Sequence, residues 1–96
     1  MADYRLSARA EGDLLDIFIY TIERFGLAQA ERYQHDLRLC LDLLAENPGM
    51  GRQANAVAEG VRRHEHGRHV IFYEVTPSGI LILALLHAAS LKGLAL

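Results

Sequence analysis

Residues 61–87, VRRHEHGRHVIFYEVTPSGILILALLH, place the strongest constraint on how this chain can fold. They contain three short segments with strand-like patterns, separated by breaks at residues 66–67 and 76–79. Both breaks contain glycine, which supplies positive φ, and the second contains proline, which presets φ for a turn. Because segments this closely spaced are joined most simply by hairpins, we expect three consecutive antiparallel strands.

Two helical patterns precede these strands. Apolar residues recur at helical spacing over residues 14–25 and again over residues 30–44, with Gly26 between the two runs. Ser7 is suited to cap the first helix, because its hydroxyl can accept a backbone N–H of the first turn. Pro48 ends the second helix, because proline cannot continue it. So short a link between helices predicts an antiparallel helical hairpin.

The order of these elements predicts the fold class. Tyr4-Arg5-Leu6 alternates and is expected to be a first strand, whereas residues 50–60 are expected to form an ordered loop. Helices grouped before a meander of strands predict an α+β protein of order β-α-α-β-β-β, with the hairpin packed on one face of a small antiparallel sheet. A chain of 96 residues is expected to form a single domain, residues 1–96.

The apolar composition predicts a surface for a partner. Hydrophobic residues make up 51% of the chain, and both faces of the last two predicted strands are apolar. A helical hairpin covers only one of these faces. We therefore expect the other face to be covered by the C-terminal tail, by another subunit or by a partner segment.

Charge and composition exclude several classes of function. The net charge of −2 argues against general affinity for nucleic acid, and we expect no direct sequence-specific nucleic-acid binding by the chain alone. Residues 1–60 hold six arginines and ten acids, whereas residues 61–96 hold four basic residues and two acids. The single Cys40 forms no internal disulfide, and no apolar run reaches membrane-spanning length. We expect a soluble cytoplasmic protein without a cofactor.

Residues spread over nearly the whole chain together resemble the ParE branch of the RelE/ParE toxin superfamily, the toxic halves of bacterial toxin–antitoxin pairs. The resemblance rests on the ensemble and on its spacing, since no single motif is diagnostic. The matching positions are Tyr4, Leu6-Ser7, Ala10, Asp13-Leu14, Ile17, Tyr20, Phe25-Gly26, Gln29-Ala30, Tyr33, Leu37, Leu44-Ala45, Pro48, Gly51-Arg52, Gly60-Val61-Arg62, His69, Ile71, Tyr73, Gly79-Ile80, Ile82 and Leu86-His87.

The resemblance implies two partners and two sets of contact residues. The first partner is a ParD-like antitoxin in a hetero-oligomer, a heterotetramer or larger, that lays a helix and an extended piece across hairpin and sheet. The second is DNA gyrase, inhibited by binding rather than by catalysis. We expect the antitoxin to contact Leu15, Ile19, Leu39, Leu43, Ile71 and Tyr73, and the target to contact Arg62, Arg68, His87 and Lys92.

Two alternatives to gyrase inhibition stay open. The RelE branch cleaves mRNA on the ribosome, and here Arg62, His64 and His87 would supply the acid, base and cation for that chemistry. Residues 88–96 depart from the family pattern, which leaves open a degenerate toxin that only binds antitoxin. The histidines at positions 64, 66 and 69 are expected to be surface residues rather than metal ligands, because they do not complete a tetrahedral set.

Overall fold

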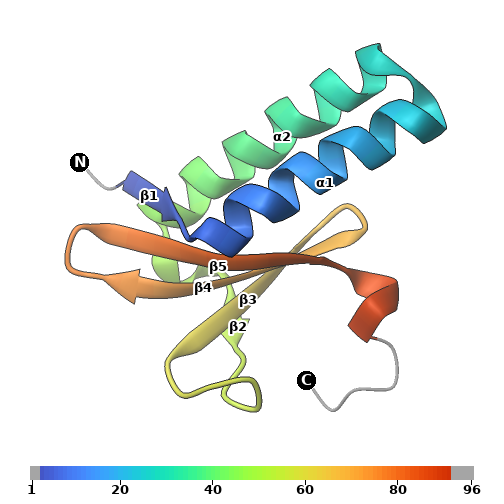
Figure 1. Ribbon diagram of the computed structural model, residues 1–96. Coiled ribbons are helices and arrows are strands. Elements are labelled where there is room, and N and C mark those ends of the chain that lie inside the picture. Colours follow the sequence, from blue (N-terminus) through green and yellow to red (C-terminus); the bar gives the residue numbers. More distant parts are fainter. Residues whose placement is uncertain (1–2, 92–96) are drawn as a thin grey trace.

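The computed structural model describes residues 3–91, which form a helical hairpin lying on one face of a five-stranded sheet (Figure 1). The predicted order of helices and strands is confirmed, with one further short strand. The elements are β1 (Asp3–Leu6), α1 (Ala8–Phe25), α2 (Leu27–Glu46), the 3-10 helix η1 (Pro48–Met50), β2 (Arg52–Gln53), β3 (Val61–His66), β4 (His69–Thr76), β5 (Gly79–His87) and the 3-10 helix η2 (Ala88–Leu91).

The sheet has the strand order β1-β5-β4-β3-β2, and its three long strands form the predicted antiparallel meander. The prediction of a wholly antiparallel sheet was wrong, because β1 pairs with β5 in parallel, Tyr4 opposite Ile80. The direction of β1 depends on where the hairpin returns the chain to the sheet, which no local pattern encodes. Strand β2 was expected to be loop, since two residues are too few to show an alternating pattern.

Local capping explains where the helices begin and end. Ser7 caps α1 as predicted: its hydroxyl accepts the backbone N–H of Ala10 at 3.0 Å and donates to the carbonyl of Leu83 on β5 at 2.9 Å. Gly26 separates α1 from α2 with φ of 89°, a conformation that favours glycine. This tight link holds the two helices side by side over the sheet (Figure 1).

The main core lies between the hairpin and the sheet. Ile71 and Tyr73 are both fully buried there, so their predicted place on a partner-binding surface is corrected: they belong to the core. An irregularity between Phe72 and Tyr73 breaks the regular register of β4 and β5. As a result Ile82 and Leu85, three residues apart, both face the helices. The sequence pattern alone does not reveal such a shift.

A second cluster covers the opposite face of the sheet. Its buried members are Ala54, Val61, Val70 and Phe72, and Leu83, Leu86 and Leu91 pack against them. The loop after β2 and the helix η2 therefore cover much of the face for which a partner was one of the expected occupants. The remaining tail residues, 92–96, lie outside the described residues. Within residues 3–91, no helix is both long and apolar enough to cross a membrane.

Candidate partner-binding sites

The first candidate site is a groove on the hairpin, here called the hairpin groove, with a volume of about 420 Å³. Leu15 is 58% exposed at this groove, and Ile19, one helical turn further along α1, is 45% exposed. The side-chain oxygen Oε1 of Gln34 is buried here, and among the described residues it has no hydrogen-bond partner. The groove thus combines exposed apolar side chains with one unused acceptor. It is lined by Leu6, Glu11, Leu14, Leu15, Phe18, Gln34 and Arg38.

The exposed leucines of α2 form a separate surface. Leu39 and Leu43 are 49% and 55% exposed, as a partner-binding role requires, but neither lines the hairpin groove. Leu43 follows Gln34 by nine residues, which places the two side chains about 180° apart around the helix. Of the four apolar residues predicted to meet one partner, Leu15 lines the hairpin groove, whereas Ile19, Leu39 and Leu43 do not.

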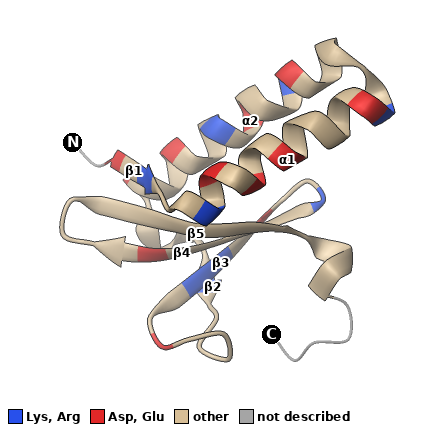
Figure 2. Ribbon diagram, in the orientation of Figure 1, with Lys and Arg blue, Asp and Glu red and all other residues tan. Residues whose placement is uncertain are grey.

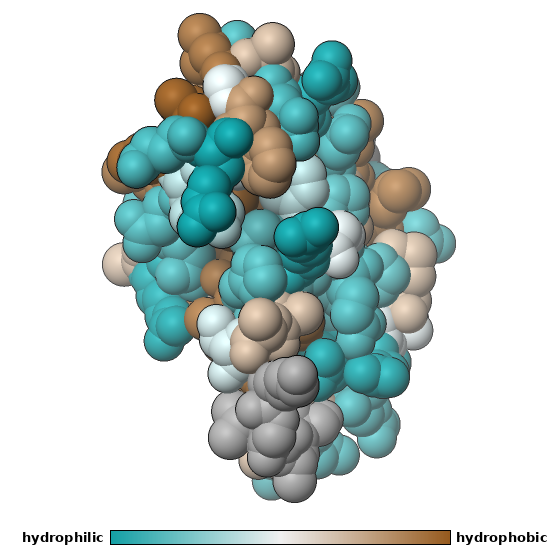
Figure 3. Space-filling view, turned by 90° about the vertical axis from the view of Figure 1, so that its right-hand side faces the viewer, coloured by the Kyte–Doolittle hydropathy of each residue, from teal (hydrophilic) through white to brown (hydrophobic). Residues whose placement is uncertain are grey.

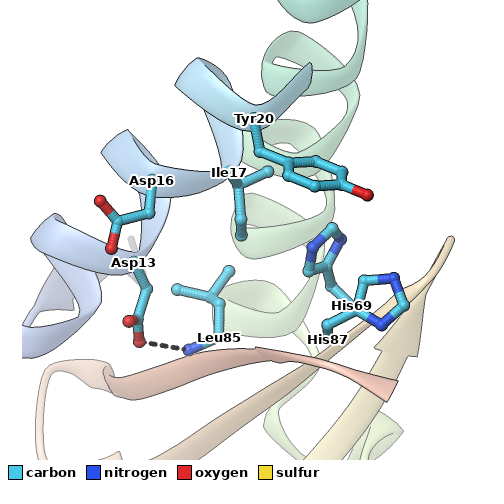
Figure 4. A pocket seen from close by; sticks show the side chains of 7 residues that line it. All are labelled: Asp13, Asp16, Ile17, Tyr20, His69, Leu85 and His87. Carbon is cyan, nitrogen blue, oxygen red and sulfur yellow. Dashed lines mark hydrogen bonds between the residues drawn. The ribbon is translucent and has the colours of Figure 1, made fainter. Parts of the chain in front are cut away.

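The second candidate site is a cleft of about 460 Å³ between α1, α2 and the β3–β4 turn, here called the histidine cleft. His69 begins β4 and His87 ends β5, and the two residues are paired in the sheet register. Their rings meet edge to face, with centroids 5.4 Å apart. Figure 4 shows the two imidazoles together near the ring of Tyr20. The helices contribute Tyr20, Arg24, Phe25, Gln29 and Tyr33 to the cleft.

The two sides of this region carry opposite charge. Arg24 and Arg68 line the histidine cleft, and no acidic side chain of residues 3–91 does so. An adjoining hollow of about 350 Å³ shares Tyr20 and both histidines with the cleft, but is lined by Asp13 and Asp16. These carboxylates lie at the far end from the imidazoles in Figure 4.

The environment of the histidines determines their charge. Burial lowers the pKa of His69 below its ordinary value of 6.5, and the nearby His87 and His66 lower it further. Burial also lowers the pKa of His66, although Asp36 acts in the opposite direction. His66 and His69 are therefore mainly neutral at neutral pH. The guanidinium groups of Arg24 and Arg68 supply permanent positive charge to the cleft.

The residues predicted for catalysis are not brought together. Arg62 donates to the carbonyl oxygens of Gly51 and Gly49, so its guanidinium holds the loop before β2. In the register Arg62 of β3 pairs with Tyr73 of β4. His87 of β5 pairs with His69, which lies four residues before Tyr73 on β4, so Arg62 and His87 lie on opposite sides of that strand. Two strand spacings alone amount to about 10 Å. The geometry therefore gives no support to an endoribonuclease centre of Arg62, His64 and His87.

The residues predicted to bind the target are only partly brought together. Arg68 and His87 share the histidine cleft, Arg62 does not line it, and Lys92 lies outside the described residues. Figure 2 shows that acidic residues are spread along both helices, whereas β5 carries no Lys, Arg, Asp or Glu. Within residues 3–91, no group of three potential ligands is placed to hold a metal ion.

Arg68 and His87 are the residues of the histidine cleft that were predicted as site residues, so Tyr20, Arg24, Tyr33 and His69 are among those that the sequence-based prediction missed. Tyr20 and Arg24 are four residues apart on the polar side of α1, and the guanidinium lies 5.1 Å from the ring centroid. That spacing was a usable signal, because such pairs are neighbours on a helix. Tyr33 was counted only as part of an apolar stripe, although its hydroxyl faces the histidines.

These observations define the class of protein as a two-layer α+β domain with two surface sites that can each hold a segment of a partner protein. A solved structure described as "Chromosomal ParDE TA system from P. aeruginosa" has the same fold, with a TM-score of 0.76 and 20% sequence identity. The match covers 91% of this chain and 96% of that chain. The fold predicted from the resemblance is thereby confirmed.

The family itself follows from sequence comparison. The family model for the "ParE toxin of type II toxin-antitoxin system, parDE" matches residues 4–91, and the chain belongs to this family. It is 44% identical over 75 residues to Toxin ParE1 of Caulobacter vibrioides, covering 78% of each chain. It is 36% identical over 85 residues to Toxin ParE1 of Mycobacterium tuberculosis, covering 88% of this chain and 87% of the relative.

Proposed function

We propose that this ParE-family chain is neutralised by a ParD-like antitoxin that binds the hairpin groove, and that the free toxin inhibits DNA gyrase by binding to it. The observation that carries the antitoxin part is the groove itself. Leu15 lines the groove and is 58% exposed, and within residues 3–91 the buried Oε1 of Gln34 beside it has no hydrogen-bond partner. Ile19, one turn further along α1, adds a 45% exposed apolar side chain. Exposed apolar side chains beside a groove are typical of a surface that binds a partner chain.

An amphipathic helix is the occupant that suits this groove. Apolar side chains of such a helix would bury Leu15 and Phe18, and each large apolar side chain that becomes fully buried contributes about 1.5–3 kcal/mol. Glu11 and Arg38, which carry opposite charges, also line the groove. Charges of both signs at the edge of an interface mainly fix orientation and partner choice.

An N–H or hydroxyl donor on the partner would complete the site by bonding to Oε1 of Gln34. A buried acceptor without a partner costs about 1–3 kcal/mol, so its satisfaction on binding would add to affinity and to specificity. A partner without such a donor would bind the groove less tightly.

The antitoxin part is tested with the product of the adjacent reading frame, which we expect to encode the ParD-like partner. Leu15→Asp places a charge in the groove and should weaken the complex at least about tenfold, corresponding to about 1.4 kcal/mol. Leu39→Asp is the matched control, since Leu39 is also about half exposed, at 49%, but does not line the groove. Equal losses in both variants, measured by isothermal titration calorimetry, would argue against the groove.

The gyrase part is tested separately by supercoiling of relaxed plasmid DNA with purified gyrase. The free toxin should inhibit supercoiling, and addition of the antitoxin should restore it. A toxin that binds the antitoxin but leaves supercoiling unchanged at every concentration would remove gyrase as the target while leaving the toxin–antitoxin pairing intact.

A further inference from the structure

We propose that the histidine cleft is a second docking site, which accepts a single acidic side chain carried on an apolar peptide segment of a partner protein. The proposal goes beyond antitoxin binding at the hairpin groove, because the two sites lie on opposite flanks of α1. Leu15 and Arg24 are nine residues apart, which places them about 180° apart around the helix.

Unpaired positive charge is the first observation that supports an acidic occupant. Within residues 3–91, neither Arg24 nor Arg68 has an ion-pair partner. The Cζ atom of Arg24 lies over the ring of Tyr20, 5.1 Å from the ring centroid, and this cation–π contact limits the freedom of the guanidinium before a ligand binds. Both arginines are exposed and therefore accessible to a ligand. A guanidinium can hold a carboxylate by two parallel hydrogen bonds.

The apolar walls of the cleft are the second observation. Phe25 is 58% exposed and Tyr20 is 50% exposed, although both are large aromatic residues. Figure 3, which looks onto the right-hand side of Figure 1, shows hydrophobic residues gathered toward the end of the hairpin above a mainly hydrophilic surface. A volume of about 460 Å³ lies within the range of about 300–1,000 Å³ typical of ligand sites, so it can hold a few side chains.

The adjoining acidic hollow is the third observation, and it favours a peptide over a nucleic acid. Asp13 and Asp16 line the hollow that shares Tyr20, His69 and His87 with the cleft. A polyanion following this surface would meet both carboxylates, whereas one isolated carboxylate would contact only the positive end. Asp13 accepts the backbone N–H of Leu85 at 3.0 Å, which holds the negative end of the surface in place.

The probe for this site is a short acetylated and amidated peptide with one glutamate between leucines, titrated into the full chain without antitoxin. Its matched control is the same peptide with glutamine in place of glutamate. In nuclear magnetic resonance spectra, the chemical shifts of the ring protons of His69 and His87 should change when the glutamate peptide is added. The glutamine peptide should cause clearly smaller changes in these chemical shifts. Equal changes with both peptides would overturn the proposal.

Variants of the chain locate the charge that matters. The double variant Arg24→Gln and Arg68→Gln should weaken binding of the glutamate peptide about tenfold, because it removes both unpaired guanidinium groups. Arg32→Gln is the matched control, since Arg32 is an exposed arginine of α2 outside the cleft. Unchanged binding in the double variant, or an equal loss in the control, would overturn the assignment of the site.

A competition arm separates a carboxylate from a phosphate. Adenosine monophosphate should displace the glutamate peptide no better than acetate does at the same ionic strength. If it displaces the peptide at much lower concentration, the cleft is a phosphate site and the peptide proposal falls. None of these measurements involves gyrase or antitoxin, so their failure would leave the proposed function untouched.

Discussion

The hydroxyl oxygen of Tyr33 lies 2.7 Å from Nδ1 of His69, and this contact joins the middle of α2 to the first residue of β4. The same hydroxyl donates to the carbonyl of His66 at 3.1 Å, just before the β3–β4 turn. Gly67 in this turn has φ of 56°, and a Cβ there would come within 2.7 Å of the Tyr33 hydroxyl. Tyr33 of α2 therefore holds the β3–β4 turn in place, and Gly67 and Arg68 of this turn line the histidine cleft.

Removal of this hydroxyl should weaken the protein. Tyr33→Phe keeps the ring but leaves the groups at His66 and His69 without their partner, and we expect the free energy of unfolding to fall by about 1–2 kcal/mol. Urea denaturation measures the loss. Tyr20→Phe serves as the control, because Tyr20 is half exposed. An equal change in both variants would show that the Tyr33 contacts contribute nothing particular.

Acidification should destabilise the fold through His66 and His69. Their pKa values are lowered on folding, mainly by burial, so the unfolded chain binds more protons between the folded value and the ordinary value of 6.5. This contribution to stability is present above the ordinary value and is lost as the pH falls below it. At His66 the charge of Asp36 opposes the effect and His64 adds to it, whereas at His69 the effect is increased by His87 and His66.

Denaturation midpoints measured from about pH 8 to about pH 5 test this dependence. Replacement of both histidines by glutamine should flatten the profile in this range. Replacement of the exposed His35 on α2 by glutamine should leave the profile as it is in the unmodified protein. A profile that stays equally steep without His66 and His69 would assign the pH dependence to other groups.

Tyr73→Phe should be more damaging than Tyr33→Phe. Its buried hydroxyl donates to the carbonyl of Pro48 at 2.7 Å and accepts the N–H of Gly51 at 3.0 Å. Loss of the hydroxyl leaves a buried N–H and a carbonyl without partners, which should lower the free energy of unfolding by about 2–4 kcal/mol. Thermal denaturation measures the change, and a loss below that of Tyr33→Phe would contradict it.

Arg62 should behave as a structural residue. Arg62→Met removes its hydrogen bonds to the carbonyls of Gly49 and Gly51, and should lower the free energy of unfolding by about 1–2 kcal/mol. Arg52→Met is the control, because Arg52 forms an exposed ion pair with Glu65, of the kind that contributes at most about 1 kcal/mol. Urea denaturation distinguishes the two, and equal small effects would argue against the structural role.

Two glycines should respond to alanine in opposite directions. A Cβ at Gly79 would overlap the backbone of Asp3, so Gly79→Ala should separate β1 from β5 and cost more than about 2 kcal/mol. Gly12 lies within α1 with no atom near its would-be Cβ, so Gly12→Ala should stabilise the chain by about 0.5–1 kcal/mol. Chemical denaturation of both variants provides the test. Stabilisation by Gly79→Ala would rule out the close β1–β5 contact.

Much of the fold could be predicted because its signals are local. The Ser7 cap, the break at Gly26 and the turn at Gly67 each depend on the conformation of a few neighbouring residues. Leu15 and Leu39, which the family resemblance implied as antitoxin contacts, are both exposed. The candidate sites were predicted less well, because each combines side chains from elements far apart in the sequence.

The sequence by itself determined the two helices, the three-stranded meander and their order, since periodicity and turn chemistry act over a few residues. Tertiary structure alone decided that β1 runs parallel to β5, that Ile71 and Tyr73 are core residues, and that the chain covers much of its own second sheet face. It also brought Arg24 of α1 and Arg68 of the β3–β4 turn to one cleft with His69 and His87. Strand direction and side-chain proximity depend on how whole layers pack, and that information is not contained in any single segment.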